Sequence, residues 1–212
     1  MSPSIKNQLK KIPGVDKVAH ALGLVSNPLE DRTFLLQMLP KNSVGAEIGV
    51  HKGDFSERIL EIVQPRQFHL IDPWKHESSA AYQDALYGGQ AKNGQDEMDR
   101  RYEAVRSRFQ SQMGRGQVEF HRGFSTDVLN QFADDSLDWV YIDGNHLYDY
   151  VKKDIALSFR KTKKGGFVTG DDYMDGGWWD GGVKKAVDEF AKTPAAELVE
   201  IRHNQFIFRR KS

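Results

Sequence analysis

The chain of 212 residues contains no cysteine, and its 30 Lys and Arg residues are balanced by 30 Asp and Glu residues. Without cysteine there is no disulfide framework, thiolate zinc site, iron–sulfur cluster or thiol nucleophile, so catalysis has to use oxygen or nitrogen groups or a hard metal ion. A net charge of zero lacks the electrostatic footprint of a protein that grips nucleic acid or an anionic membrane. We therefore predict no nucleic-acid partner and no membrane partner.

Long apolar runs are missing as well. The start, MSPSIKNQLKKIPG, has no stretch of signal-peptide length, and no window approaches the roughly 20 apolar residues of a membrane span. We expect a soluble, cytoplasmic protein. The length and the 39% of apolar residues predict one domain with a real core over residues 1–212.

Short β-branched or aromatic runs alternate with amphipathic helical patterns from residue 43 to about 190, as is typical of an α/β domain. The expected strands are residues 43–50, 67–72, 117–121, 137–143 and 166–171. The expected helices cover residues 54–63, 98–109, 148–159 and 183–190, and the first of them opens with the capping-box spacing of Asp54 and Glu57. The runs 198–201 and 205–208 predict an antiparallel hairpin that closes one side of the sheet.

Three segments do not fit the simple alternation. Residues 1–42 predict a basic helical lead-in that stops at Pro40 and whose apolar stripe covers an end of the sheet: Leu29, Phe34, Leu35, Met38 and Leu39. Residues 75–95 are longer than an ordinary βα connection and predict an inserted lid or substrate wall that carries Tyr82 and Tyr87. Residues 161–164 are interpreted as the solvated end of a helix that Gly165 and Gly166 stop.

In a parallel sheet, ligands bind outside the carboxyl ends of the strands. After the first expected strand, Gly49 and Gly53 either let the backbone approach a ligand or simply shape the turn. Glu47 puts a carboxylate where a phosphate would otherwise rest, which favours a cationic or hydroxyl-bearing ligand over a pyrophosphate. Asp72 ends the second strand, where its two oxygens suit a vicinal diol or cap a helix that begins near Pro73.

Three further acids are expected to meet in the same crevice, because Asp143 ends the fourth strand and Asp171 and Asp172 end the fifth. Their oxygens suit Mg²⁺, Ca²⁺ or Mn²⁺, or else the last two acids cap a turn. His146 follows on the same loop as Asp143 and is the candidate general base, because imidazole titrates in the working range. The alternative for His146 is a supporting or surface role, and His51 is a weaker candidate base.

These residues resemble class I S-adenosylmethionine-dependent methyltransferases, in particular the metal-dependent O-methyltransferases of the catechol and macrocin types that act on small molecules. Five motifs carry the resemblance in order over about residues 43–190: Glu47-x-Gly49-x-x-x-Gly53, Asp72-Pro73-Trp74, Gly123-Phe124-Ser125, Tyr141-Ile142-Asp143-Gly144-x-His146-x-Tyr148, and Gly165-Gly166-Phe167 running into Asp171-Asp172-Tyr173.

The resemblance implies a Rossmann-like, doubly wound α/β sheet of seven strands, mostly parallel with an antiparallel C-terminal strand, and helices on both faces. It implies that Glu47, Gly49 and Gly53 hold the methionine part of the cofactor and Asp72 its ribose, with Gly123 and Ser125 near the adenine and Asp143 beside the cofactor. It also transfers a metal role to Asp143, Asp171 and Asp172. Relatives often carry His before the last of these acids, so that Asp171 departs from that variant.

Paired aromatics on a glycine-rich loop, Trp178 and Trp179, are expected with Tyr173 to stack on the substrate or to exclude water. A packed cap or a contact between two copies of the chain is the alternative for this loop. We predict an enzyme that transfers a methyl group from S-adenosyl-L-methionine to a hydroxyl of a small molecule with the help of Mg²⁺ or Ca²⁺. The alternatives are a metal-independent N- or carboxyl-methyltransferase and a non-catalytic module that binds the adenosine cofactor.

Overall fold

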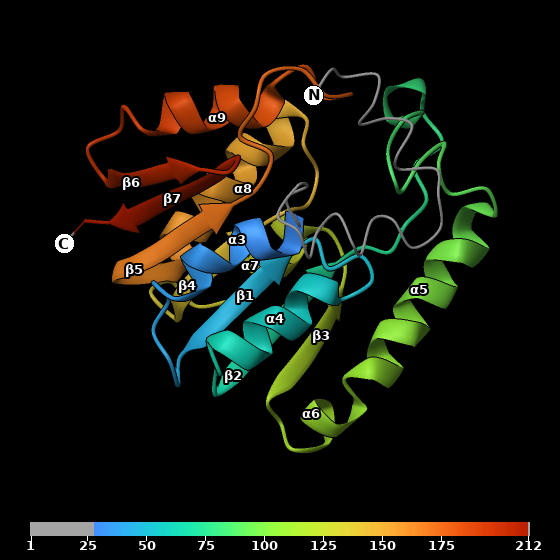
Figure 1. Cartoon of the computed structure of the whole chain (residues 1–212), viewed down its shortest axis with the longest axis horizontal. Coiled ribbons are helices and arrows are strands. Elements are labelled where there is room, and N and C mark those ends of the chain that lie inside the picture. Colours follow the sequence, from blue (N-terminus) through green and yellow to red (C-terminus); the bar gives the residue numbers. More distant parts are fainter. Residues whose placement is uncertain (1–27, 212) are drawn as a thin grey trace, which may run out of the picture.

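The structure, a computed structural model, describes residues 28–211, and the first part of the predicted lead-in lies outside these residues. Seven strands form one sheet in the order β3-β2-β1-β4-β5-β7-β6 (Figure 1). The strands are β1 (Val44–Ile48), β2 (Gln67–Asp72), β3 (Val118–Arg122), β4 (Leu137–Ile142), β5 (Thr162–Gly170), β6 (Ala196–Arg202) and β7 (Gln205–Arg210). The helices are α3 (Pro28–Leu36), α4 (Asp54–Ile62), η1 (Ala80–Tyr82), α5 (Gly94–Arg108), α6 (Gln110–Gly114), α7 (Ser125–Leu129), α8 (Tyr148–Lys161) and α9 (Gly182–Phe190).

Strands β1 to β5 pair in parallel, and β7 lies antiparallel beside β5, which confirms the predicted mixed sheet of seven strands. The hairpin of β6 and β7 closes one edge, also as predicted. Because β6 pairs antiparallel with β7, it runs in the same direction as β1 to β5. Only β7 therefore breaks the parallel rule among the described strands.

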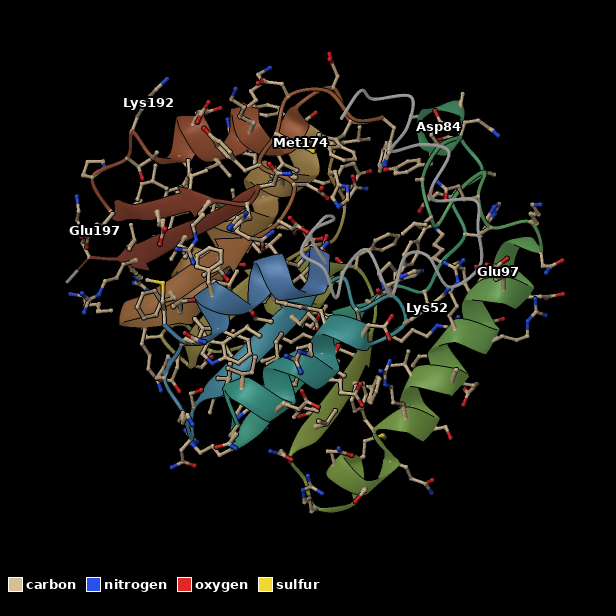
Figure 2. The ribbon with its side chains drawn as sticks, in the orientation of Figure 1. Lys52, Asp84, Glu97, Met174, Lys192 and Glu197 are labelled. Atoms are coloured by element: carbon tan, nitrogen blue, oxygen red, sulfur yellow. The ribbon has the colours of Figure 1, made fainter. Side chains whose placement is uncertain are left out.

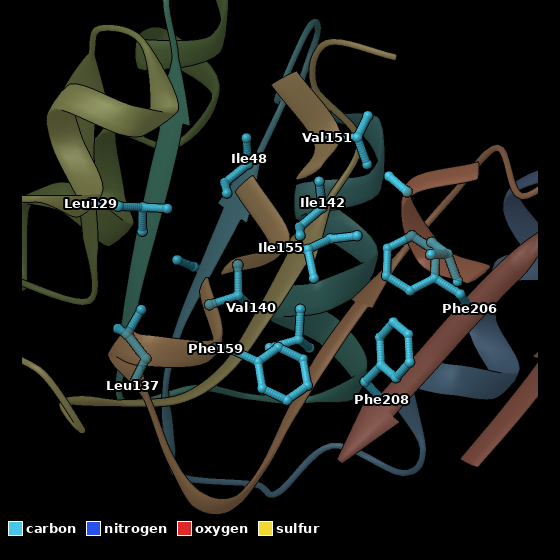
Figure 3. Close-up of a cluster of buried hydrophobic side chains, with 14 of the residues drawn as sticks. Ile48, Leu129, Leu137, Val140, Ile142, Val151, Ile155, Phe159, Phe206 and Phe208 are labelled. Atoms are coloured by element: carbon cyan, nitrogen blue, oxygen red, sulfur yellow. The ribbon is translucent and has the colours of Figure 1, made fainter. Parts of the chain in front are cut away.

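One face of the sheet is covered by α7, α8 and α9, which bury a common apolar cluster against the strands (Figure 3). Side chains alternate across β1, so that Val44, Ala46 and Ile48 all enter this cluster. From the helices, Ile155 and Phe159 of α8 pack against the sheet at the helical spacing that the sequence predicts. Each fully buried aliphatic or aromatic side chain contributes roughly 1.5–3 kcal/mol to this packing.

The opposite face carries α3, α4 and α5 over a second apolar cluster. Within the described part of the lead-in, Leu35 and Leu39 are buried there, and Phe34 and Met38 are packed against them. Gly45 makes room for the Trp139 ring, since a Cβ on this glycine would lie 2.0 Å from the indole. The described part of the lead-in thus packs on a face of the sheet rather than on the predicted end, and α3 ends at Leu36, four residues before Pro40.

Two local predictions are wrong. Gly53, not Asp54, is the N-cap of α4, in a left-handed conformation and without a side-chain cap. Asp54 and Glu57 instead both accept hydrogen bonds from Arg108 of α5, at 2.6 Å each. Lys161 is buried rather than solvated because its amine reaches the carbonyl of Phe132 and the carboxylate of Asp134. Strand β5 starts directly after it, so the expected glycine stop lies inside the strand.

Candidate active site

A cavity of about 730 Å³ opens at the carboxyl ends of β1, β2 and β4. Residues from the turn after β1, the loop after β4, the start of α7 and the segment between β2 and α5 line it. That last segment corresponds to the predicted lid at residues 75–95, and Figure 1 shows it on the side of the sheet toward which β1 points. Figure 2 labels Asp84 on this lid and Lys52 on the turn after β1, both of which line the cavity. Cavities of this size hold small-molecule ligands in proteins.

The turn after β1 is tied to the end of β2 by one carboxylate. Asp72 is buried and accepts hydrogen bonds from the backbone amides of Val50 at 2.9 Å and His51 at 3.0 Å through Oδ2. The same oxygen accepts a 2.5 Å bond from the Tyr87 hydroxyl of the lid, while Oδ1 accepts from the amide of Trp74 at 2.7 Å. No helix begins at Pro73, so Asp72 is not the helix cap that was its alternative.

Glycine is required at the same turn for steric reasons. Gly49 has φ of +89°, and a Cβ on it would lie 1.9 Å from the backbone oxygen of Asp143. Beside it, Glu47 is fully buried at the cavity wall, and Ser56 donates a 2.5 Å hydrogen bond to its Oε2. Burial raises the pKa of Glu47 well above its usual range, and a cationic ligand group facing it would lower this pKa and stabilise the carboxylate.

The predicted acids do converge, but Asp171 faces Arg32 and Gln205, whereas Asp143 and Asp172 line the cavity. Arg32 of α3 donates a 2.8 Å bond to Oδ2 of Asp143 and pairs through its other terminal nitrogen with Asp171. Asp171 also accepts from the side-chain amide of Gln205 and, at 2.7 Å, from the amide of Asp172. With both oxygens in contact with donors, Asp171 does not line the cavity, whereas Asp143 and Asp172 do.

His146 takes the place at the cavity that was expected for Asp171. Its Nε2 lies 3.5 Å from Oδ1 of Asp143 and 3.2 Å from Oδ2 of Asp172. One ligand atom from each of these three residues lies within 4.8 Å of the others, a spacing that a divalent cation could bridge. The two carboxylates and the imidazole therefore bring together the donor atoms of a candidate metal site, and Asp171 is turned away from them.

Burial and the neighbouring charges together set the pKa values of these groups. Burial raises the pKa of Asp171 to about 7, with repulsion from Asp143 adding to it, and burial also raises the pKa of Asp172. Burial opposes ionisation of Asp143 too, yet its contacts with His146 and Arg32 hold its pKa below the usual range. Burial lowers the pKa of His146, but the carboxylates of Asp143 and Asp172 outweigh it, and the net pKa is raised.

Two segments far apart in the sequence meet over the cavity. The ring of Tyr82 in the lid lies 5.4 Å from that of Trp178, and its hydroxyl accepts a 2.7 Å bond from Asn145. The His146 ring lies 5.7 Å from Trp178 and 4.8 Å from Trp179. The predicted lid and the predicted aromatic loop thus form one roof above His146.

Other predicted residues lie outside the cavity lining. Tyr173 donates to Asp188 of α9, and Gly53 packs near Phe109, where a Cβ would lie 2.8 Å from its ring. Gly123 donates from its amide to the carbonyl of Asp72 at 3.1 Å. Ser125 does line the cavity, although its hydroxyl donates a 2.5 Å bond to the buried Asp154.

Arg32 and Phe124 are two of the cavity-wall residues that sequence reasoning missed. Arg32 carried no signal, because a single arginine in a basic segment resembles its solvated neighbours, and only the fold brings it to Asp143, 111 positions away. Phe124 stands between the two residues assigned to the adenine and was itself given no role. Phe124 is 40% exposed at this end of the cavity, and the ammonium group of Lys75 lies 5.0 Å from the centre of its ring.

His51 also lines the cavity, and it differs from His146. Burial lowers the pKa of His51 to about 4, so that the imidazole is neutral near pH 7. Its Nε2 is buried without a hydrogen-bond partner among the described residues. Its carbonyl meanwhile accepts a 3.0 Å bond from the indole of Trp74, which is fully buried in the core.

Comparison with known proteins places the chain in a family. Residues 46–173, more than half of the chain, match the family described as a methyltransferase domain, and the chain belongs to this family. A search of the curated proteins found no match. No helix among the described residues is long and apolar enough to cross a membrane.

Solved structures share the fold at low sequence identity. The O-methyltransferase NovP has a TM-score of 0.56 and 23% identity, over 87% of this chain and 76% of that one. The O-methyltransferase TomG from Streptomyces achromogenes, solved with S-adenosylmethionine, has a TM-score of 0.61 and 16% identity, over 89% and 82%. The N-methyltransferase NodS from Bradyrhizobium japonicum WM9 has a TM-score of 0.56 and 16% identity, over 88% and 99%.

Fold, cavity and family agree on the class of enzyme. A strand-end cavity with a glycine turn, a buried Glu47 and a buried Asp72 fits a ligand that carries a cationic group and a diol. The protein is a class I S-adenosylmethionine-dependent methyltransferase.

Proposed function

We propose that the protein methylates a hydroxyl group of a small molecule and that a divalent metal ion, Mg²⁺ or Ca²⁺, assists it. The observation that carries the proposal is the cluster of Asp143, His146 and Asp172, which lines the same cavity as Asp72 and the glycine turn. O-methylation needs a hydroxyl that has lost its proton, and this cluster provides both a cation site and a base.

The cofactor lies along the ends of β1 to β4 in this proposal. Asp72 takes the ribose, because Oδ1 accepts only one hydrogen bond within the described residues and has a lone pair to spare. Glu47 faces the ammonium group of the methionine part, and the exposed ring of Phe124 stacks on the adenine. When bound, the cofactor supplies an electrophilic methyl group on a sulfonium sulfur.

The acceptor hydroxyl lies between the cofactor and His146. A divalent cation held by Asp143 and Asp172 would supply a positive charge that lowers the pKa of that hydroxyl. His146 takes the proton as the oxygen forms its bond to the methyl carbon and the bond between that carbon and the sulfonium sulfur breaks, which leaves S-adenosylhomocysteine. Asp143 and Asp172 hold the imidazole in place, with Nε2 of His146 at 3.5 and 3.2 Å from their oxygens.

The roof of Tyr82, Trp178 and Trp179 limits the acceptor to a small molecule. It spans the cavity above His146 and presents aromatic faces, which suit a sugar or an aryl ring. The balance of 30 basic and 30 acidic residues is unfavourable for a nucleic-acid acceptor.

The test uses purified, tag-free protein in two stages. Calorimetric titration with S-adenosylhomocysteine measures cofactor binding. Formation of the same product from S-adenosylmethionine is then measured with a panel of catechol and hydroxylated sugar acceptors, after EDTA treatment and after return of Mg²⁺ or Ca²⁺. We expect EDTA to reduce turnover and one of the cations to restore it. Full turnover on a true acceptor in EDTA would show that the metal part is wrong.

Two variants with matched controls separate the roles. Asp172→Asn should abolish the response to the cation, and Asn tolerates the φ of 61° at this position. Asp175→Asn, at an exposed residue of the next turn, should not. The turnover rate should rise with pH through a pKa above 6.5 and then level off, because His146 acts as a base only when it is neutral. His146→Gln should remove this rise, whereas His76→Gln, outside the cavity lining, should keep it.

A further inference from the structure

A second group of metal-ligand side chains lies at the edge of the sheet, away from the cavity. In the parallel pairing of β2 and β3, His69 stands opposite Glu119. His121 follows two positions later on β3 and therefore points to the same face of the sheet. None of the three residues lines the active-site cavity. β3 is the edge strand of the described sheet at this end.

The three side chains converge on one point. Nδ1 of His69 lies 3.0 Å from Nε2 of His121. Oε2 of Glu119 lies 3.5 Å from Nδ1 of His69, and Oε1 of Glu119 lies 3.9 Å from Nε2 of His121. The ring of Phe132 packs edge-on against both imidazoles, with centroids 4.8 and 5.5 Å away. His69 is buried and His121 half-buried, while Glu119 reaches in from the solvent side.

A hydrogen bond between the two imidazoles does not account for the whole group. Two neutral rings can share only one proton between these nitrogens, so one nitrogen offers a lone pair to the other. The carboxylate of Glu119 brings further lone pairs to the same point. When one ring donates to the other, the accepting nitrogen has no proton to offer Glu119, and a cation between the rings and the carboxylate would pair with lone pairs of all three side chains. Burial favours the neutral rings, lowering the pKa of His69 to about 4 and also lowering that of His121.

The spacing matches that of a tetrahedral metal site. With bonds of about 2.0–2.1 Å to zinc, ligand atoms in a tetrahedron lie about 3.3 Å apart. The two nitrogens lie 3.0 Å apart, Oε2 of Glu119 lies 3.5 Å from Nδ1 of His69, and one ligand atom from each of the three residues lies within 4.8 Å of the others. Two imidazoles and one carboxylate are also a ligand set that zinc takes in proteins, with water in the fourth position.

We propose that His69, Glu119 and His121 form a binding site for a divalent transition-metal ion, with Zn²⁺ as the expected occupant. The ion joins the edge strand β3 to β2, three residues before Asp72, and holds both strands in register. The fourth position faces solvent beside the exposed Glu119 and holds water. The site is separate from the cluster of Asp143, His146 and Asp172, and it does not depend on the proposed acceptor chemistry.

The experiment measures Zn²⁺ binding to the full, tag-free chain by calorimetry, since a histidine tag would itself bind the ion. The double variant His69→Gln/His121→Gln removes both imidazoles, and Glu119→Gln/His121→Gln keeps the buried His69 in case the first variant does not fold. The matched control is Asp143→Asn/Asp172→Asn, which disables the cavity cluster. Co²⁺ serves as a spectroscopic probe of the coordination geometry.

We expect the control to bind one equivalent of Zn²⁺, the wild-type chain to bind this equivalent in addition to any ion at the cavity cluster, and the Tm of both to rise. Each of the two double variants, His69→Gln/His121→Gln and Glu119→Gln/His121→Gln, should weaken Zn²⁺ binding by more than about 100-fold, because each loses direct ligands rather than supporting groups. Co²⁺ should give the intense absorption of a tetrahedral centre in the control but not in the edge-strand variants. The proposal is wrong if the control binds no Zn²⁺, or if the double variants at His69, Glu119 and His121 bind as much Zn²⁺ as the wild-type chain does.

Discussion

Arg32 and Asp143 form an ion pair of 2.8 Å between residues that lie 111 positions apart in the chain. The same guanidinium pairs with Asp171, so that one arginine of α3 joins the ends of β4 and β5. This contact fixes the lead-in helix against the active site. It also compensates part of the negative charge that three neighbouring aspartates bring to the cavity.

Arg32→Gln should therefore destabilise the protein by about 3 kcal/mol, because the buried Asp171 and the partly buried Asp143 lose their cationic partner. Urea unfolding at pH 7 measures the change. Arg58→Gln breaks an exposed pair with Glu61 and should change the stability by less than about 0.5 kcal/mol. Equal effects of the two variants would mean that the Arg32 contacts contribute no more than a surface pair.

Asp72→Asn should weaken the binding of S-adenosylhomocysteine by about 10- to 100-fold, the effect of losing a charged hydrogen-bond acceptor. Asparagine has a single acceptor oxygen, so it cannot accept hydrogen bonds from the turn and from the ribose at the same time. Calorimetry measures the Kd, and circular dichroism checks the fold. Asp84→Asn, an exposed acid on the cavity rim, is the control and should bind as the wild type does.

Asp154 should make the stability depend on pH. Burial raises the pKa of this carboxyl to about 7, so the folded protein keeps a proton that the unfolded chain has released. The contribution of Asp154 to the free energy of unfolding is therefore fully present below the unfolded pKa of about 4. It is lost as the pH rises toward 7, by up to about 4 kcal/mol in all.

Asp154→Asn keeps an acceptor for Ser125 and carries no charge. We expect this variant to be more stable than the wild type at pH 8, with little difference at pH 4, in urea unfolding followed over that range. Asp149→Asn removes an exposed carboxylate from the same helix and serves as the control. If the free energies of unfolding of the wild type and of Asp154→Asn change in parallel with pH, the pKa of Asp154 is the same in the folded and the unfolded protein.

Trp178→Ala should loosen the lid. The ring of Tyr82 loses its aromatic partner at 5.4 Å, so amide hydrogen exchange over residues 79–90 should become faster. Exchange in the strands should not change, because Trp178 belongs to neither apolar cluster of the core. Met174→Ala, on the same loop and outside the cavity lining, should leave the lid protected. Unchanged protection in Trp178→Ala would mean that the lid is held by Asn145 and its own turns.

Much of the fold could be predicted from the sequence because the signals are local. Apolar runs of strand length, helical spacing in residues such as Ile155 and Phe159, and the turn before β7 depend on neighbours a few positions away. Asp72 and Asp143 were found in the same way, since a residue that ends a parallel strand reaches the ligand edge of the sheet. The missing cysteines also limited the chemistry that the protein can use, whereas the balanced charge leads only to a prediction about its partners.

Tertiary structure alone decided which groups share a contact. The sequence placed three aspartates in one crevice, but the fold turns Asp171 toward Arg32 and Gln205 and brings His146 between Asp143 and Asp172. Likewise, His69 and His121 lie 52 positions apart and meet only because β2 and β3 pair in one register. Side-chain direction and charge pairing depend on packing between distant segments, and no local pattern in the chain encodes them.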